Sequence, residues 1–268
     1  MDRAARVYDD VFQMLPSVEE PTPLVRINRL NPDRETFPLF AKLEWFNPTG
    51  SVKDRAAWAM IQDLEARGLL GQGRGIVEPT SGNTGLALAA LAGARGHATR
   101  VVVPKKVPVE KRTLLRLAGA EVDVINDQLC PAPGLGEGAI NLAKTHARAQ
   151  GDRYTMPNQY ENQQNALAHE RTTGPEIWRQ TAGKVTHVFA ALGSCGTITG
   201  LARFLKKQNP AVRIIAVQPT PGHDVPGLRN TAELAVSTLY DPSLIDEVLE
   251  IDHELAYRRA AELFRTEG

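Results

Sequence analysis

The stretch Asn47-Pro48-Thr49-Gly50-Ser51-Val52-Lys53-Asp54-Arg55, called here the lysine turn, decides how the rest of the chain is interpreted. It follows an apolar run typical of a strand and precedes a helical pattern, so it predicts a turn that ends a strand and opens a helix. Asn47 and Pro48 favour a turn. Gly50 permits a close backbone approach, and Ser51 can cap the helix that follows.

Lys53 is expected in the first turn of this helix. A helix start carries unpaired N–H groups and partial positive charge, which disfavour a second cation and tend to lower its pKa. An amine that loses its proton more easily is a better nucleophile. Lysine and serine also occur at helix starts in proteins without such chemistry, so the lysine turn alone does not indicate a function.

The composition is that of a soluble globular protein, with 42% hydrophobic and 23% charged residues in a chain of 268. Lys plus Arg equals Asp plus Glu at 31 each, so the global charge gives no reason to expect nucleic acid or an anionic membrane as a partner. No apolar run approaches the about 18 residues of a membrane span, and the first 20 residues lack the apolar core of a signal peptide. We therefore expect a cytoplasmic protein that acts on a small neutral or zwitterionic substrate.

The cysteines and histidines form no pattern typical of a metal site. Cys130 and Cys195 are far apart in the sequence and belong to no Cys-x-x-Cys or Cys/His spacing. Each of the six histidines is interpreted as a surface or packing residue. We expect neither a disulfide framework nor a metal, and a Ser/His/Asp hydrolase is also disfavoured.

Strand and helix patterns alternate along the chain, which predicts an α/β fold with mostly parallel sheets in two lobes. The expected strands are 39–44, 75–78, 99–104, 121–125, 154–156, 185–190 and 213–217. The expected helices run from the lysine turn to about 68 and over 84–95, 109–119, 139–150, 197–207 and 255–268. A long helical region from 163 to about 181 is expected to break near Gly174-Pro175, and an N-terminal helical segment is expected to end at Pro21.

Two further turns join the lysine turn in being rich in Gly, Ser, Thr and Asn. They are the asparagine turn, residues 80–85 (Thr-Ser-Gly-Asn-Thr-Gly), and the glycine loop, residues 193–197 (Gly-Ser-Cys-Gly-Thr). Helix starts at the carboxyl ends of parallel strands bind anions, so the asparagine turn suits a carboxylate and the glycine loop a phosphate dianion. The glycine loop lacks the lysine of a Walker A loop and the spacing of a dinucleotide fingerprint, which argues against ATP and NAD. A lysine, a phosphate nest and a carboxylate cradle are together what pyridoxal phosphate chemistry on an amino acid needs.

These turns, with Pro21-Thr22-Pro23-Leu24 and Asn158-Gln159-Tyr160, resemble in order the blocks of the cysteine synthase and cystathionine β-synthase family of fold type II pyridoxal phosphate enzymes. The resemblance covers essentially the whole chain. It implies two lobes, each an open, mostly parallel sheet flanked by helices, as in the tryptophan synthase β-like fold. Residues 1–46 with 163–268 would form the larger, cofactor-phosphate-binding lobe, and residues 47–162 the smaller, mobile, substrate-binding lobe. A homodimer is also implied.

The resemblance also implies roles for individual residues. Lys53 would form a Schiff base with pyridoxal 5'-phosphate and later move the substrate's α-proton, and Asn83 would hydrogen-bond the cofactor's ring hydroxyl. The residues expected to hold the substrate carboxylate are Thr80, Ser81, Gly82, Thr84 and Gln159. Those expected to bind the cofactor phosphate are Gly193, Ser194, Cys195, Gly196 and Thr197.

Two features depart from the family pattern. Cys195 stands where relatives usually carry Gly or Thr, and we interpret it as a buried structural thiol, with a redox or cofactor-tuning role as the alternative. Relatives continue with a Ser-rich turn that faces the cofactor's pyridine nitrogen, whereas this chain ends at Thr266-Glu267-Gly268. We therefore expect a C-terminally truncated form that lacks a final strand and helix, and its activity stays open at this point.

The implied reaction is that of a cysteine synthase, a transferase that replaces the β-substituent of O-phosphoserine or O-acetylserine by a sulfur nucleophile through an aminoacrylate. Leu228-Arg229-Asn230 resembles the segment of enzymes that use O-phosphoserine. Arg229 can pair bidentately with a phosphate, and a solvated loop arginine is the alternative interpretation. Free sulfide and a carrier-protein thiocarboxylate both stay open as the sulfur source.

The same residues are compatible with three other enzyme activities. An O-acetylserine-using synthase, a cystathionine β-synthase and a serine or threonine dehydratase are the alternative enzymes. Dehydratases favour Gly-Ser-Phe-Lys in the lysine turn, so Val52 argues against them. A non-catalytic binding or regulatory paralogue is a hypothesis of a different kind, because the complete lysine turn counts against it and the missing C-terminal segment counts for it.

Overall fold

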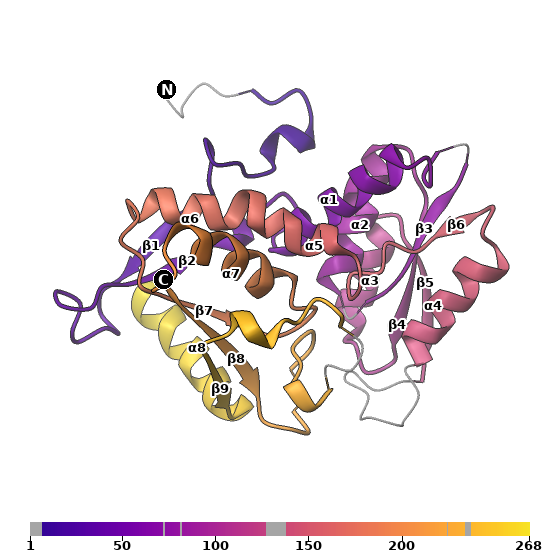
Figure 1. Ribbon diagram of the computed structural model, residues 1–268. Coiled ribbons are helices and arrows are strands. Elements are labelled where there is room, and N and C mark those ends of the chain that lie inside the picture. Colours follow the sequence, from indigo (N-terminus) through magenta and orange to yellow (C-terminus); the bar gives the residue numbers. More distant parts are fainter. Residues whose placement is uncertain (1–6, 72, 81, 127–137, 224, 234–236) are drawn as a thin grey trace.

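Two parallel sheets stand apart in the molecule, and a long helix passes from one to the other (Figure 1). The computed structural model describes residues 7–71, 73–80, 82–126, 138–223, 225–233 and 237–268. Among the helices in these ranges, none combines the length and the apolar character needed to cross a membrane.

The first parallel sheet has the strand order β5-β4-β3-β6. Its strands are β3 (Gly75–Pro79), β4 (Thr99–Pro104), β5 (Glu121–Ile125) and β6 (Tyr154–Thr155). The helices around it are α1 (Lys53–Ala66), α2 (Asn83–Ala94), α3 (Val109–Leu117) and α4 (Gly138–Ala149). Each neighbouring pair of strands is parallel, as the alternation of strand and helix predicts.

Both faces of this sheet are covered by helices. Alternate residues of a strand face opposite sides, so Ile76, Val101 and Val103 pack toward α1, α2 and α3. Val77 and Val102 pack toward α4 on the other side. A strand that is buried on both faces needs a continuous apolar run, which is why β4 was recognisable from its sequence.

The second parallel sheet has the strand order β7-β8-β9. It consists of β7 (His187–Ala191), β8 (Arg213–Pro219) and β9 (Glu247–Ile251), with α7 (Gly196–Gln208) and α8 (His253–Glu267) beside it. Ile198, Leu205 and Ile214 belong to the buried cluster between α7 and this sheet. β9 was not predicted, because the two glutamates of its sequence Glu-Val-Leu-Glu-Ile stand three positions apart, which breaks the alternation of a half-buried strand, and none of its residues is fully buried.

The N-terminal part differs from its prediction. β1 (Leu24–Ile27) pairs antiparallel with β2 (Leu39–Lys42), whereas only the second of these strands was expected. The expected N-terminal helical segment is wrong for the described residues, which contain a short 3₁₀ turn at Val11–Met14 with Asp10 as its cap. Further 3₁₀ turns are Glu44–Phe46, Thr231–Glu233 and Pro242–Leu244.

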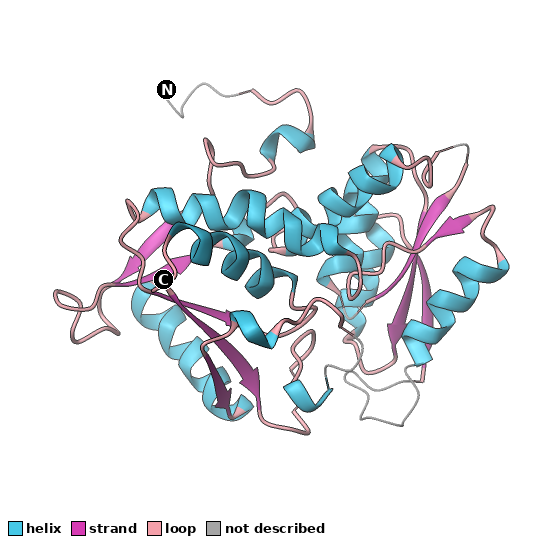
Figure 2. Cartoon of the chain, viewed as in Figure 1, coloured by secondary structure: helices cyan, strands magenta, loops and turns pink. Residues whose placement is uncertain are grey.

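α5 (Gln163–Ala168), a π-helical turn (His169–Thr173) and α6 (Gly174–Gln180) follow one another without interruption (Figure 2). The predicted break at Gly174-Pro175 is therefore wrong, because Gly174 has helical angles and Pro175 lies in the first turn of α6. A proline lacks the N–H group and its ring crowds the carbonyl four residues earlier. That carbonyl belongs to the wider π turn, so the irregularity lies one turn before the proline and the helix continues.

The lobe boundaries at residues 46/47 and 162/163 stay a prediction. The strands of the first sheet lie between residues 75 and 155, and those of the second sheet between residues 187 and 251. The helix made of α5, the π turn and α6 connects the two regions, so its side chains can contact both.

Candidate functional site

The lysine turn opens α1 with Lys53 as the first helical residue. The residue before it, Val52, caps the helix without a side-chain hydrogen bond. Ser51 still contributes, because its Oγ accepts the N–H of Lys53 at 3.3 Å. Asp54 reaches back and accepts both the N–H and the hydroxyl of Thr49. The turn is therefore closed mainly by Asp54, which the sequence had not singled out.

The amine of Lys53 lies where it loses its proton more easily than usual. Burial lowers the pKa of Lys53, and only a thiolate at Cys195 would oppose this shift. In return the Lys53 charge contributes to lowering the pKa of Cys195. The lysine turn and the glycine loop therefore lie close enough for a charge on one to affect the titration of the other, although 142 residues separate Lys53 from Cys195 in the sequence.

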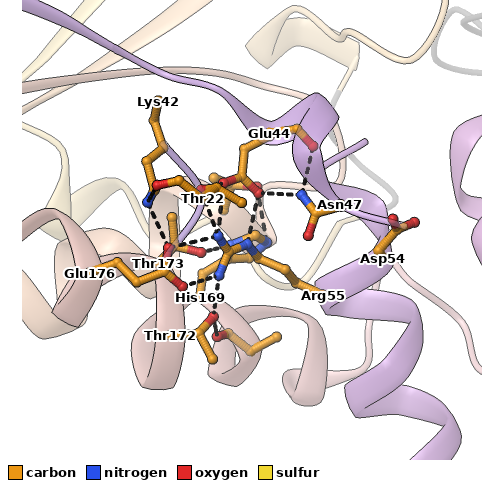
Figure 3. A network of polar contacts seen from close by, with 12 residues as sticks. Thr22, Lys42, Glu44, Asn47, Asp54, Arg55, His169, Thr172, Thr173 and Glu176 are labelled. Carbon is orange, nitrogen blue, oxygen red and sulfur yellow. Dashed lines mark hydrogen bonds and ion pairs between the residues drawn. The ribbon is translucent and has the colours of Figure 1, made fainter. Parts of the chain in front are cut away.

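A buried network of charged side chains fixes the start of α1 (Figure 3). Arg55 donates to Glu44 at 2.7 and 2.8 Å and to Glu176 at 2.5 and 2.9 Å. Lys42 forms an ion pair with Glu176 at 2.6 Å. Two cations thus face two carboxylates, which offsets the cost of burying each charge. Because Arg55 is two residues after Lys53, the network anchors the turn that carries the amine.

The asparagine turn connects β3 to α2. Thr80 is buried, and its Oγ1 accepts the N–H groups of Gly82 and Gly85 at 3.0 and 3.1 Å. Gly82 has φ +150°, a conformation that favours glycine, and Asn83 is an exposed first residue of α2. Ser81 lies outside the described residues. The turn therefore presents a helix start, where unpaired N–H groups can bind an anion.

Gln159 lies against this turn. The hydroxyl of Thr84 donates to its Oε1 at 2.8 Å, and its Nε2 donates to the carbonyl of Pro79 at 3.1 Å. Both side chains are buried. Three of the residues predicted to hold the substrate carboxylate, Thr80, Thr84 and Gln159, are therefore brought together by the fold.

Glu78 supports this arrangement from β3. It is fully buried and accepts the backbone N–H groups of Asn158 and Gln159 at 2.8 and 3.0 Å. Burial raises the pKa of Glu78 from 4.5 to about 7, although the two N–H groups pull it down. Glu78 could not be singled out from the sequence, because one glutamate in a strand has no distinctive spacing.

The raised pKa of Glu78 predicts a pH effect on stability. Between pH 4.5 and 7 the folded chain binds the Glu78 proton more tightly than the unfolded chain, so the free energy of unfolding falls as pH rises through this window. We expect Glu78 to contribute a fall of about 3 kcal/mol between pH 4 and pH 8. Urea unfolding of the native chain and of Glu78→Gln at several pH values measures it, and parallel pH profiles for the two proteins would contradict the prediction.

The glycine loop joins β7 to α7 at the carboxyl end of the second sheet. A Cβ on Gly193 would lie 2.5 Å from the carbonyl of Gly227, and one on Gly196 would collide with Asn165. Cys195 caps α7 in the left-handed conformation, with φ +66°. The loop is therefore tightly packed from behind, and the N–H groups at the start of α7 are available to an anion.

Cys195 is 3% exposed, and burial raises its pKa to about 11. The thiol therefore stays protonated at neutral pH, although Lys53 and Arg229 both pull its pKa down. This environment supports the interpretation of Cys195 as a buried structural thiol, since a reactive cysteine needs a lowered pKa.

The two hydroxyl residues of the glycine loop each have a buried polar partner from the long helix. Asn165 Nδ2 donates to Ser194 Oγ at 2.9 Å, and His169 Nε2 lies 3.2 Å from Thr197 Oγ1. The sequence prediction missed Asn165 and interpreted His169 as a surface or packing residue. Their spacing of four residues places both on one helix face, and this was the available signal.

Arg229 is buried rather than solvated, with 6% of its surface exposed. Its backbone N–H donates to the carbonyl of Leu192, next to the glycine loop, at 2.9 Å. Its guanidinium lies 5.0 Å from the ring centre of Tyr160. The alternative of a solvated loop arginine is therefore wrong, and Arg229 stands between the glycine loop and the segment that carries Gln159.

These positions suit pyridoxal phosphate. An amine of lowered pKa at the start of α1 fits the cofactor's aldehyde carbon, and a tightly packed loop at the start of α7 fits its phosphate. The asparagine turn, at the start of α2, offers backbone N–H donors for an amino-acid carboxylate. Lys53, Asn83 and the glycine loop are the residues that would hold the cofactor.

Comparison with known proteins also identifies the chain as a pyridoxal phosphate enzyme. The family model described as pyridoxal-phosphate dependent enzyme matches residues 15–268. Cysteine synthase B of Salmonella typhimurium is 41% identical over 248 residues, which cover 92% of this chain and 79% of that protein. The structure of O-ureido-L-serine synthase matches with a TM-score of 0.87 and 32% identity over 98% of this chain and 82% of that one. Cysteine synthase of Entamoeba histolytica matches with a TM-score of 0.84 and 28% identity, over 100% of this chain and 79% of that one.

These likenesses extend over nearly the whole described fold, with both parallel sheets and the helix between them. They confirm the predicted fold type II architecture and the predicted cofactor. The chain belongs to the family of pyridoxal-phosphate dependent enzymes.

Proposed function

We propose that this protein is a cysteine synthase, which replaces the β-substituent of an activated serine by a sulfur nucleophile. The observation that carries the proposal is that the long helix holds both the start of α1 and the glycine loop. Arg55, two residues after Lys53, donates to Glu176 of this helix, and Thr197 of the glycine loop contacts His169 of the same helix. The similarity to cysteine synthase B of Salmonella typhimurium supports the same reaction class.

Each step of this reaction is assigned to particular residues of the chain. When bound, pyridoxal phosphate supplies a ring that stabilises negative charge at the substrate's α-carbon. Lys53 Nζ takes the proton from the α-carbon and returns one after the new C–S bond has formed at the β-carbon, and its lowered pKa suits both steps. The N–H groups at the start of α2 orient the substrate through its carboxylate, and Thr80, Thr84 and Gln159 hold the asparagine turn in the shape that presents them.

The donor is proposed to be O-phosphoserine, because Arg229 is a buried cation beside the proposed site. A buried guanidinium presents several N–H donors in a fixed plane, which match a phosphate better than an acetyl ester. The cation–π contact with Tyr160 fixes the plane of that guanidinium. An O-acetylserine-using enzyme gains nothing from this group.

Replacing Arg229 by leucine tests the donor. We expect kcat/KM for O-phosphoserine to fall by about 10- to 100-fold, the effect of losing hydrogen bonds between charged groups, and kcat/KM for O-acetylserine to stay within about twofold. Arg229→Lys keeps the charge but loses the planar fork, so an intermediate value is expected. Steady-state kinetics with both donors and sulfide measure this.

The matched control is Arg258→Leu, since Arg258 is exposed on α8. It should leave both donors unaffected. Full O-phosphoserine activity in Arg229→Leu ends the donor proposal without affecting the assignment as a cysteine synthase.

Product formation separates the alternative activities. With an activated serine, a cysteine synthase yields cysteine from sulfide or a carrier thiocarboxylate, whereas a cystathionine β-synthase needs homocysteine. A serine or threonine dehydratase yields a keto acid without any sulfur compound. Failure to form any of these products, with pyridoxal phosphate bound, favours a non-catalytic paralogue.

A further inference from the structure

The long helix places two buried polar side chains against the glycine loop. Asn165 lies at α5 and His169 follows one turn later in the π turn, so both face the start of α7. The long helix and α7 approach each other closely, because a Cβ on Gly196 would collide with Asn165 and one on Gly200 would lie 2.6 Å from His169 Cβ. The hydroxyls of Ser194 and Thr197 are therefore each supported from behind.

A hydroxyl that binds a phosphate dianion must donate its proton, because the dianion offers acceptors and no donors. Such a hydroxyl can still accept a hydrogen bond from a neighbour. Asn165 Nδ2 donates to Ser194 Oγ at 2.9 Å, so the Ser194 proton is available to an anion. The amide nitrogen of Asn165 also donates to the carbonyl of Gln159 at 2.7 Å, which fixes its orientation.

The direction of the bond at Thr197 depends on the tautomer of His169. His169 Nε2 lies 3.2 Å from Thr197 Oγ1, and its Nδ1 lies 2.9 Å from Thr173 Oγ1. Figure 3 labels His169 and Thr173. With the proton on Nε2, the imidazole donates to Thr197 and accepts from Thr173. With the proton on Nδ1, it accepts from Thr197, whose proton is then withheld from an anion.

The imidazole of His169 is neutral, so only one of its two ring nitrogens carries a proton. It is 1% exposed, and burial together with the charges of Arg55 and Lys53 lowers its pKa to about 3. Arg55 is itself held by Glu44 and Glu176, so its charge stays fixed near the imidazole. An imidazolium, which would donate on both sides, is therefore disfavoured.

We propose that His169 is a positioning residue for the cofactor phosphate, and that phosphate binding selects the tautomer that carries its proton on Nε2. In that state Nε2–H donates to Thr197 Oγ1, Thr197 donates to the phosphate, and Thr173 donates to Nδ1. The proposal rests on the assignment of the cofactor phosphate to the glycine loop.

Two substitutions at His169 separate this role from packing. The amide nitrogen of Gln can lie near the position of Nε2, and that of Asn near the position of Nδ1. We expect His169→Asn to weaken pyridoxal phosphate binding by about tenfold or more, the effect of one hydrogen bond to a charged group. His169→Gln should lose less, and the affinity for pyridoxal, which has no phosphate, should change by less than about twofold in both.

Thr197→Val provides the second half of a double-mutant cycle. It should weaken pyridoxal phosphate binding to a similar degree as His169→Asn, and the double variant should show little additional loss because both act through one hydroxyl. Titration of the cofactor-free full chain, followed by absorbance, gives each dissociation constant. Equal losses for pyridoxal and pyridoxal phosphate, or fully additive losses in the cycle, would overturn the role of His169.

The tautomer itself is visible in the imidazole ¹⁵N chemical shifts of histidine-labelled protein, with His169→Gln used to assign the signal. The expected result is a protonated Nε2 and an unprotonated Nδ1 when pyridoxal phosphate is bound. A protonated Nδ1 in that state would refute the proposal. If the native chain binds pyridoxal as tightly as pyridoxal phosphate, the glycine loop does not hold the phosphate, and the proposal falls with that assignment while the reaction class stands.

Discussion

Lys53→Ala is expected to lose the long-wavelength absorbance of bound pyridoxal phosphate and at least about 10³-fold of its activity. The amine is the group that would bond to the cofactor's aldehyde carbon and that would also move the substrate's α-proton. A lowered pKa makes it suited to both tasks. Absorbance spectra after addition of pyridoxal phosphate, with turnover measured on the same samples, check the prediction.

The control for this substitution is Lys184→Ala. Lys184 is exposed in the segment before β7, outside the candidate site, so both the spectrum and the activity should be retained. An unchanged spectrum in Lys53→Ala would mean that another amine holds the cofactor, and the assignment of Lys53 would be wrong.

Glu176→Ala should produce the largest loss of stability. Glu176 has no exposed surface and binds both Arg55 and Lys42. Without it, two buried cations share the remaining carboxylate of Glu44. Removing one partner of a buried ion pair costs about 3–5 kcal/mol, because an uncompensated charge stays inside. Urea unfolding at neutral pH measures the free energy of unfolding.

Glu247→Ala is the matched control, because Glu247 pairs with Arg213 at the surface, with both side chains more than 40% exposed. Such a pair contributes at most about 1 kcal/mol. The prediction fails if the two substitutions cost the same. Since the network anchors the start of α1, a destabilised Glu176→Ala protein should also bind pyridoxal phosphate less tightly.

Much of the fold could be predicted from the sequence because strands buried on both faces need continuous apolar runs. β4 at Thr99–Pro104 was predicted at its observed bounds for this reason. β5 at Glu121–Ile125 was also predicted at its observed bounds, because charged and apolar residues alternate over its first four positions, as in a half-buried strand. β9 at Glu247–Ile251 was missed because it is largely exposed and its two glutamates stand three positions apart, which breaks the alternation of a half-buried strand. The helix was predicted to break at Pro175 because sequence rules do not anticipate a π turn that accommodates the proline.

The candidate site could be predicted to the extent that its residues lie in turns after strands. The carboxyl ends of parallel strands meet at one edge of a sheet. The asparagine turn follows β3 and Gln159 follows the neighbouring strand β6, so the two are neighbours by topology alone. Asn165 and His169 could not be identified in this way, because a polar residue on a helix looks the same in the sequence whether it faces solvent or a buried loop. Arg55 is a similar case, since its partners Glu44 and Glu176 are 11 and 121 residues away.

Gln159 forms hydrogen bonds with residues in both halves of the molecule. Glu78 and Thr84, on the side of the first sheet, bind its N–H and its side chain. On the other side, Asn165 binds its carbonyl and also Ser194. Any swing of the first sheet against the second that preserves these bonds must therefore be a rotation whose axis passes near Gln159. A carboxylate held near Gln159 would stay almost still during such a rotation, and the displacement of any other atom would grow with its distance from the axis.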